Sequence, residues 1–331
     1  MMILLLQSRE VRRSNDTRGN SKTNLRMGAD VSTVVYELRD YQQQAVDEIL
    51  HQFDKKAKPF IIQAATGAGK SLIIADLVSK LDGHALILQL GREILQQNYD
   101  KLASYIGEEE LGIFSASLER REIKRYTFAT IQSIYKIPEE FEHFDTLIID
   151  EAHLINDKKA DAMLTSFIRA TKISKIVGLT ASPYRLESKT IRTDYGQFRS
   201  ESYLRTIIGP DRLFKSMPYS VETAELVERG YLAKINYRNE PVPWTTLVPS
   251  ASGFTKKSLD SFERKNKITD KAIRQILQSD LIGHKTITFA ATLDHAEIIL
   301  AATESKVEIA LISSKTSASD RARLIADYKE N

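Results

Sequence analysis

The sequence contains no cysteine among its 331 residues, which excludes disulfide bonds and thiolate-bound zinc sites. It also lacks a long apolar run: the N-terminal stretch at residues 1–6 is shorter than a membrane span and shorter than the core of a signal peptide. We therefore expect no membrane association and no export. Both absences fit a cytoplasmic protein.

The chain carries little excess charge. Its formal net charge is +3, which is too small to indicate nucleic-acid binding, although a basic groove can lie within a nearly neutral chain. The apolar content of 42% and the charged content of 27% are ordinary for a folded globular protein. The length favours about two domains.

The most informative segment is the loop at residues 64–71, Ala-Ala-Thr-Gly-Ala-Gly-Lys-Ser, between an apolar run at 60–62 and a helical pattern at 72–77. Glycines let such a loop fold around a phosphate with its N–H groups pointing inward, and the following helix adds its positive end. The lysine supplies a charge for the β and γ phosphates, and the serine hydroxyl can bind Mg²⁺. The candidate nucleotide-binding residues of this loop are Thr66, Gly67, Ala68, Gly69, Lys70 and Ser71. Alanine replaces the first glycine of the strict pattern, so an ordinary turn entering a helix remains an alternative.

A pair of acids follows a second buried strand. Residues 144–149 are almost continuously apolar, and Asp150 and Glu151 come directly after them. Acids at this end of a strand face the crevice in which open α/β sheets bind ligands. Asp150 can hold Mg²⁺ together with Ser71, and Glu151 can orient and deprotonate the attacking water, with Lys70 as the third catalytic residue. The alternative is that both acids complement a helix dipole.

A third apolar strand, at residues 173–180, ends in Thr180-Ala181-Ser182-Pro183. Small hydroxyl side chains would then lie along the same edge of the sheet. On its own this tetrapeptide is a common turn.

Taken in this order, the phosphate loop, Asp150-Glu151-Ala152-His153 and Thr180-Ala181-Ser182 resemble motifs I, II and III of superfamily 2 helicases of the DEAH type. The resemblance implies an α/β fold with a RecA-like P-loop NTPase domain, ATP and Mg²⁺ as cofactors, and nucleic acid, DNA above all, as partner. It implies that His153, Thr180 and Ser182 couple the nucleotide state to domain movement.

Further segments extend the resemblance. Leu38-Arg39-Asp40-Tyr41-Gln42 is similar to the Q-type motif, which implies that Gln42, with Arg39, binds the adenine; a helix start is the alternative. Residues 85–97 and 127–133 are similar to segments that hold the nucleic-acid backbone. This implies contacts from Arg92, Thr130 and Gln132. For Arg92 a solvated helix start is the alternative.

Finer details resemble RadD-like bacterial DNA repair helicases, in particular Pro183-Tyr184-Arg185-Leu186 and Gly230-Tyr231-Leu232. The motor subunits of restriction enzymes and XPB-like proteins share some of these details. Three functions therefore remain open: a repair helicase, the motor of a restriction-modification enzyme, and a non-catalytic, nucleotide-gated DNA-binding fragment.

The expected organisation has four parts. Residues 1–33 are expected to form a disordered basic tail, 34–216 a complete RecA-like domain, 217–267 a connector or insertion, and 268–331 the first part of a second RecA-like domain. Trp244, in the connector, either stacks on a base or packs against the protein. Motifs V and VI of the family are not present, so we expect weak hydrolysis by this chain alone, and a protein partner or a further segment that completes the second domain.

Overall fold

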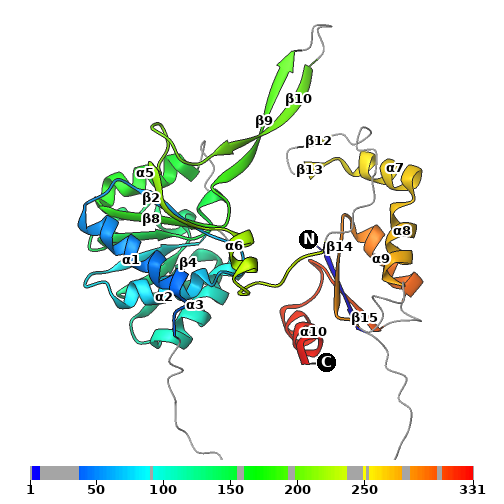
Figure 1. Cartoon of the computed structure of the whole chain (residues 1–331), viewed down its shortest axis with the longest axis horizontal. Helices are drawn as coiled ribbons and strands as arrows, with labels where there is room; N and C mark the ends of the chain where they lie inside the picture. Colours follow the sequence, from blue (N-terminus) through cyan, green and yellow to red (C-terminus); the bar gives the residue numbers. More distant parts are fainter. Residues whose placement is uncertain are drawn as a thin grey trace, which may run out of the picture. The chain divides into compact units, whose positions relative to one another are not determined.

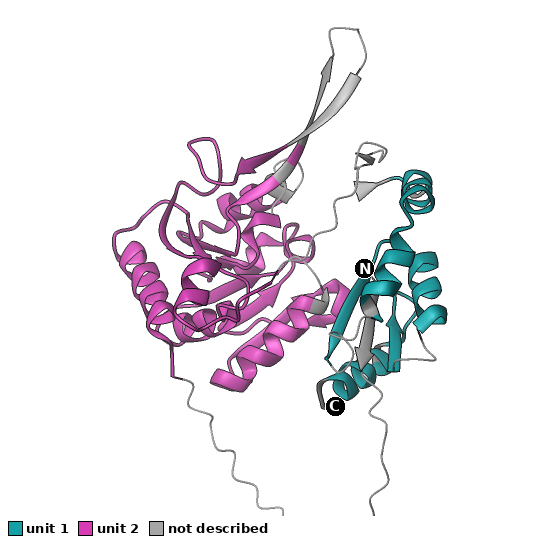
Figure 2. Cartoon of the chain, turned by 45° about the vertical axis from the view of Figure 1, so that its right-hand side comes forward, with its two compact units in different colours: residues 1–26, 237–331 teal, residues 27–236 magenta. Residues whose placement is uncertain are grey.

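We describe a computed structural model at residues 2–7, 37–89, 92–154, 160–192, 198–236, 249–250, 253–277, 284–303 and 308–330. The chain divides into two compact units (Figure 2). Unit 2 comprises residues 27–236, and unit 1 comprises residues 1–26 and 237–331. Trp244 and residues 8–33 of the expected tail lie outside the described residues.

Unit 2 is built on an eight-stranded sheet with the order β11-β2-β8-β7-β3-β6-β4-β5 (Figure 1). All neighbouring strands are parallel except β4 and β5. The strands are β2 (Phe60–Ala64), β3 (Ala85–Leu88), β4 (Leu111–Ser115), β5 (Arg120–Arg121), β6 (Tyr126–Ala129), β7 (Thr146–Ile149), β8 (Lys175–Thr180) and β11 (Ser216–Val221). The central strands are apolar and buried on both faces, as parallel sheets require.

Helices cover both faces of this sheet. Side chains alternate along each strand, so Ile62 packs into one apolar cluster with α1 (Asp40–Asp54), α2 (Lys70–Ser79) and α3 (Arg92–Ile106). Its neighbour Ile61 faces a second cluster, which includes side chains of three short helices and one longer helix. These are α4 (Ile131–Ile134), η2 (Pro138–Phe141), η3 (Ala152–Leu154) and α5 (Ala160–Thr171). The structure confirms the predicted α/β domain with a parallel sheet.

The sheet extends beyond the expected end of its domain. β11 pairs with β2 at an edge of the sheet and is followed by α6 (Thr223–Glu228), whereas the sequence places residues 217–236 in a connector. That prediction is wrong for these residues. Pro218 interrupts the strand pattern, and the register shifts between Ser216 and Tyr219, which an edge strand tolerates because one side needs no partner.

A long hairpin was not predicted at all. β9 (Tyr184–Arg192) and β10 (Phe198–Thr206) form an antiparallel two-stranded sheet that projects from the rest of unit 2 (Figure 1). It begins immediately after the third motif.

Unit 1 contains a three-stranded sheet in which β1 (Met2–Gln7) lies between β14 (Thr286–Ala290) and β15 (Glu308–Ile312), antiparallel to both. The prediction of a disordered tail is wrong for β1. Its apolar residues form a strand that satisfies the hydrogen-bonding edges of both neighbours.

The described helices of unit 1 are α7 (Lys256–Asn266), α8 (Ile268–Ile276), α9 (Leu293–Thr303) and α10 (Ala318–Glu330). The last three lie in residues 268–331, whereas α7 lies in the expected connector, for which no helix at these residues was predicted. A short hairpin of β12 (Pro249–Ser250) and β13 (Gly253–Phe254) precedes them. The side chains of Ile287 and Phe289 on β14 remain exposed. None of the helices in the described ranges combines the length and the apolar character needed to span a membrane.

Substitution of Phe141 provides a test of the apolar core of unit 2. Phe141 is fully buried, with ring centroids 5.3 Å from Phe114 and 5.8 Å from Phe167. Phe141→Ala should lower the free energy of unfolding by about 3–5 kcal/mol, because it removes apolar burial and leaves a cavity. Urea unfolding followed by circular dichroism measures the change. The matched control, Ile94→Ala on the exposed side of α3, should cost less than about 1 kcal/mol. Equal losses for the two variants would contradict the described core.

Candidate functional site

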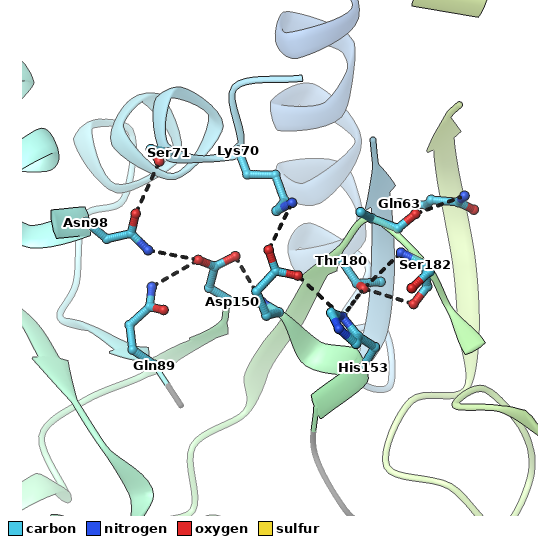
Figure 3. Close-up of polar contacts among 11 residues, drawn as sticks. Gln63, Lys70, Ser71, Gln89, Asn98, Asp150, His153, Thr180 and Ser182 are labelled. Atoms are coloured by element: carbon cyan, nitrogen blue, oxygen red, sulfur yellow. Dashed lines mark hydrogen bonds and ion pairs between the residues drawn. The ribbon is translucent and has the colours of Figure 1, made fainter. Parts of the chain in front are cut away.

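Three motifs meet at one edge of the sheet in unit 2. The order β2-β8-β7 places the phosphate loop, the third motif and the acidic pair at the carboxyl ends of three adjacent parallel strands. This is the edge at which open α/β sheets bind ligands. Figure 3 shows side chains from all three segments turned toward one another.

The phosphate loop has the conformation that its glycines allow. Gly67 and Gly69 have φ angles of +84° and +80°, a region that other residues rarely adopt. A Cβ on Gly69 would lie 2.5 Å from Nε2 of Gln42, so the loop also needs glycine there for space. Gly69 directly precedes α2, so the positive end of this helix faces the loop. Thr66 in the same loop is exposed, whereas Ala68 is buried.

An ion pair joins the first two motifs. Nζ of Lys70 lies 3.2 Å from Oε1 of Glu151. Glu151 has a positive φ of 48°, an uncommon conformation for a residue with a side chain. The structure therefore brings together the cation of the loop and the second acid of the pair.

Asp150 is held in a buried polar network (Figure 3). Its side chain is 5% exposed, and Oδ2 accepts hydrogen bonds from Nε2 of Gln89 at 3.1 Å and Nδ2 of Asn98 at 3.0 Å. The main-chain N–H of Glu151 donates to Oδ1 at 2.9 Å. Burial raises the pKa of Asp150 above its ordinary value, and the hydrogen bond from Gln89 opposes that shift. The carboxylate is thus a negative charge in a site that a cation would stabilise.

Sequence reasoning missed Gln89 and Asn98. Gln89 is the first polar residue after the apolar strand β3, a signal that could have placed it at the same edge of the sheet. Asn98 lies within α3, where nothing in the helical pattern marks it. It also accepts a long hydrogen bond of 3.5 Å from the Ser71 hydroxyl, which links the serine of the loop to Asp150.

The third motif connects to Glu151 through a histidine. Nδ1 of His153 lies 3.3 Å from Oε2 of Glu151 and 2.9 Å from the Thr180 hydroxyl. The Thr180 hydroxyl donates to the carbonyl oxygen of Ser182 at 3.0 Å and accepts from its N–H at 3.2 Å. A continuous set of polar contacts therefore runs from Lys70 to Ser182.

Gln42 lies under the phosphate loop. It is 4% exposed, its Nε2 donates to the carbonyl oxygen of Ala68 at 2.8 Å, and its Oε1 accepts from the N–H of Arg39 at 2.9 Å. The amide keeps one N–H and one lone pair for another partner. Tyr41 donates to the same carbonyl oxygen at 3.2 Å.

A group of aromatic and charged side chains lies beside Gln42. It includes Arg39, which the resemblance places at the adenine, and Arg229, to which the sequence analysis gave no role. Two guanidinium groups make cation–π contacts with the ring of Tyr231. That of Arg39 lies 4.8 Å from the ring centroid, and that of Arg229 lies 5.0 Å from the same centroid. Arg229 is also ion-paired with Asp40 and, at 3.0 Å, with Glu225. These contacts fix the segment after α6 against the start of α1.

The residues predicted to contact nucleic acid follow β3 and β6, on the same edge but further from the loop. Thr130 comes directly after β6 and is hydrogen-bonded to the Ser133 hydroxyl at 2.8 Å. Gln132 is exposed. Arg92 begins α3, and its side chain lies outside the described residues. None of the three has a described contact with Lys70 or Asp150.

The site fits Mg²⁺ and a nucleoside triphosphate. The described residues contain no cluster of three or more His, Asp or Glu side chains with metal-binding geometry. Mg²⁺ at a phosphate site needs fewer protein ligands, because substrate phosphates and waters supply the rest. Asp150 and Ser71 are the candidate ligands, and the buried charge of Asp150 is the observation that supports a cation there.

Comparisons with known proteins agree with this geometry. Residues 35–185 match the family described as type III restriction enzyme, res subunit. The chain is 26% identical over 296 residues to the DNA 3'-5' translocase XPB2 of Sulfurisphaera tokodaii, covering 88% of this chain and 58% of that protein. It is 22% identical to the DNA 3'-5' helicase XPB of Kineococcus radiotolerans, covering 91% of this chain and 50% of that protein. These matches support a superfamily 2 helicase. The narrower DEAH and RadD-like assignments stay predictions.

Similar solved structures include the UvsW helicase from bacteriophage T4, with a TM-score of 0.37, 24% identity, and coverage of 45% of this chain and 54% of that one. The restriction-modification enzyme LlaBIII bound to DNA has a TM-score of 0.44, 19% identity, and coverage of 59% and 16%. The sheet and its loop are those of a RecA-like P-loop domain. The chain spans about half the length of the curated relatives it matches.

Asp150→Asn should stabilise unit 2 at neutral pH. Because burial raises the pKa of Asp150 above 3.8, folding favours the protonated carboxyl, and stability falls as pH rises through the window between 3.8 and the raised pKa. The neutral amide keeps an oxygen for Gln89 and Asn98 and has no charge to bury, although it loses the hydrogen bond from the Glu151 N–H, which limits the gain. We expect a gain of about 0.5–2 kcal/mol at pH 7 that disappears at pH 3.

Urea unfolding at several pH values measures this difference. The control is Asp145→Asn, a half-exposed acid paired with Lys175 at 3.2 Å, which should be neutral or slightly destabilising at pH 7. A loss of stability on Asp150→Asn at pH 7 would show that the site stabilises the bare carboxylate.

Proposed function

We propose that this chain is the ATP-hydrolysing motor portion of a superfamily 2 translocase or helicase that acts on DNA. The observation that carries the proposal is the placement of Lys70, Glu151 and Asp150 at one rim of the sheet, with a buried carboxylate beside the phosphate loop. The relatives named as DNA translocases and helicases support DNA as the partner.

The residues of the site have different roles in ATP hydrolysis. The N–H groups of the loop and Lys70 bind the β and γ phosphates. Ser71 and Asp150 would hold Mg²⁺, which when bound supplies positive charge beside these phosphates. In the described structure Lys70 is paired with Glu151. A bound phosphate would compete for the lysine, and Glu151 would then be released to accept a proton from the attacking water.

The contacts of His153 could couple the state of the bound nucleotide to the third motif. Its Nδ1 faces both Glu151 and the Thr180 hydroxyl, so a change in the position of Glu151 alters the partners of Thr180 and of the Ser182 main chain. We infer that His153, Thr180 and Ser182 report the nucleotide state to the segment that follows.

For the substrate, we favour single-stranded or branched DNA in repair or recombination, with backbone contacts from Arg92, Thr130 and Gln132 and with Gln42 and Arg39 beside the adenine. A cytoplasmic, RadD-like repair helicase fits this proposal. The second candidate is the motor of a restriction-modification enzyme, which the family match over residues 35–185 favours. A nuclease segment in the intact protein would support the second candidate.

Two substitutions test the catalytic assignment. Lys70→Ala should weaken ATP binding about 10- to 100-fold, because it removes a charge-assisted contact to the phosphates. Glu151→Gln should keep ATP binding and lower the rate of hydrolysis by about 10²–10⁴, because the amide cannot accept the proton. Fluorescent ATP titration and phosphate release, each with and without DNA, separate the two effects.

The control is Lys80→Ala, a lysine at the C-cap of α2 that pairs with Asp76, at the end of the helix away from the loop. It should leave both measurements within about two-fold. If Glu151→Gln hydrolyses ATP at the rate of the unmodified chain, the role of Glu151 is wrong. If the unmodified chain binds no ATP in the presence of Mg²⁺, the proposed function fails as a whole.

A further inference from the structure

The proposed ATP site gives no role to the hairpin of β9 and β10. Each strand has nine residues and they pair in continuous register from Tyr184 opposite Thr206 to Arg192 opposite Phe198. At about 3.3 Å per residue the ribbon is about 30 Å long. It forms its own two-stranded sheet in the described part of the chain, and an isolated two-stranded ribbon is marginally stable in water.

The root of the hairpin is held by polar contacts. Glu187 accepts from the Tyr203 hydroxyl at 3.0 Å and from Nη1 of Arg205 at 2.9 Å, and it is also paired with Arg185. The N–H of Ile207 donates to the carbonyl oxygen of Pro183 at 3.0 Å. These contacts join the two strands to each other at the base of the ribbon.

The side chains described on the ribbon are not used in a core. Leu204 is 72% exposed, Tyr184 51% and Tyr203 43%. The two strands are also basic in sequence. They contain Arg185, Lys189, Arg192, Arg199 and Arg205 against Glu187 and Glu201.

We propose that the β9–β10 hairpin is a duplex DNA-binding arm. A two-stranded antiparallel ribbon has the width that the major groove of B-form DNA accepts, whereas the major groove of duplex RNA is too narrow. The excess of cations in the sequence of its strands complements the phosphate backbone, and the exposed Tyr184 can donate its hydroxyl to a phosphate oxygen. The proposal rests on the proposed function and adds the surface that would hold the duplex.

The arm is tied directly to the ATP site. β9 starts two residues after Ser182, where the contacts from Lys70 through His153 and Thr180 end. β9 also lies against η3, the short helix that contains His153. DNA held on the ribbon would therefore bias the contacts of Glu151, and the nucleotide would bias the ribbon in return.

A shortened hairpin tests the arm. Residues 188–202 are replaced by Asn-Gly, which forms a tight two-residue turn and leaves the directly paired Glu187 and Tyr203 in place. We expect binding to a duplex of about 30 base pairs to weaken at least about 10-fold at low salt, and the slope of log affinity against log salt to become shallower by about two, because phosphate contacts are lost. ATP binding and DNA-independent hydrolysis should stay within about two-fold.

Two further variants keep the ribbon at full length. Lys189→Gln combined with Arg199→Gln should reproduce part of the loss and a shallower salt slope, since each change removes a cation from the strands. The matched control is Ser188→Ala combined with Ser202→Ala, a directly opposed pair on the same strands, which should bind DNA like the unmodified chain.

The outcomes distinguish a failure of the proposed DNA-binding arm from a failure of the proposed ATP-driven function. If the unmodified chain binds duplex DNA and hydrolyses ATP, but the shortened and Lys189→Gln/Arg199→Gln variants keep its affinity and salt slope, only the arm is overturned. If the loss is as large for single-stranded DNA or duplex RNA as for duplex DNA, the assignment to duplex DNA is overturned. If the unmodified chain binds no DNA at low salt, the arm and the proposed function fall together.

Discussion

The ion pair between Lys70 and Glu151 depends on the order of strands in the sheet. The two residues are 81 positions apart in the sequence, and they meet because β8 alone separates β2 from β7 in a parallel arrangement whose carboxyl ends share one edge. The same order places Thr180 between them. The contacts that join the three motifs are therefore a consequence of sheet topology.

This arrangement has an energetic cost that unit 2 must offset. Asp150 places a carboxylate in a buried position that raises its pKa, Glu151 takes a positive φ, and two glycines fix the loop. A side-chain-bearing residue at positive φ costs on the order of 1–3 kcal/mol and persists where the surrounding structure determines it. Two extensive apolar clusters on either face of the sheet supply that surrounding structure. The concentration of these costs at one edge indicates a binding site more strongly than any single motif does.

Much of this site could be predicted from the sequence, because its signals are local. An apolar run followed by glycines and lysine, or by two acids, gives both the strand and the position of the polar residues at its end. Gln89 and Asn98 were missed since their importance lies in what they contact: Asn98 is one polar residue of an ordinary helix until the fold places it 3.0 Å from Asp150. The edge strand β11 was missed because Pro218 interrupts the pattern, and β1 because its paired residues are at least 280 positions away.

The hairpin shows a different limit of sequence reasoning. Its strands alternate polar and apolar residues only in part, and the described side chains of Tyr184, Tyr203 and Leu204 are exposed, so they give no burial pattern to detect. Yet it begins two residues after Ser182, where the polar contacts of the ATP site end. An isolated two-stranded ribbon is only marginally stable in water. This ribbon also starts where the contacts from the phosphate loop end, so a ligand bound outside the core explains best why the chain keeps it. The charge of its strands makes a polyanion the ligand of matching chemistry.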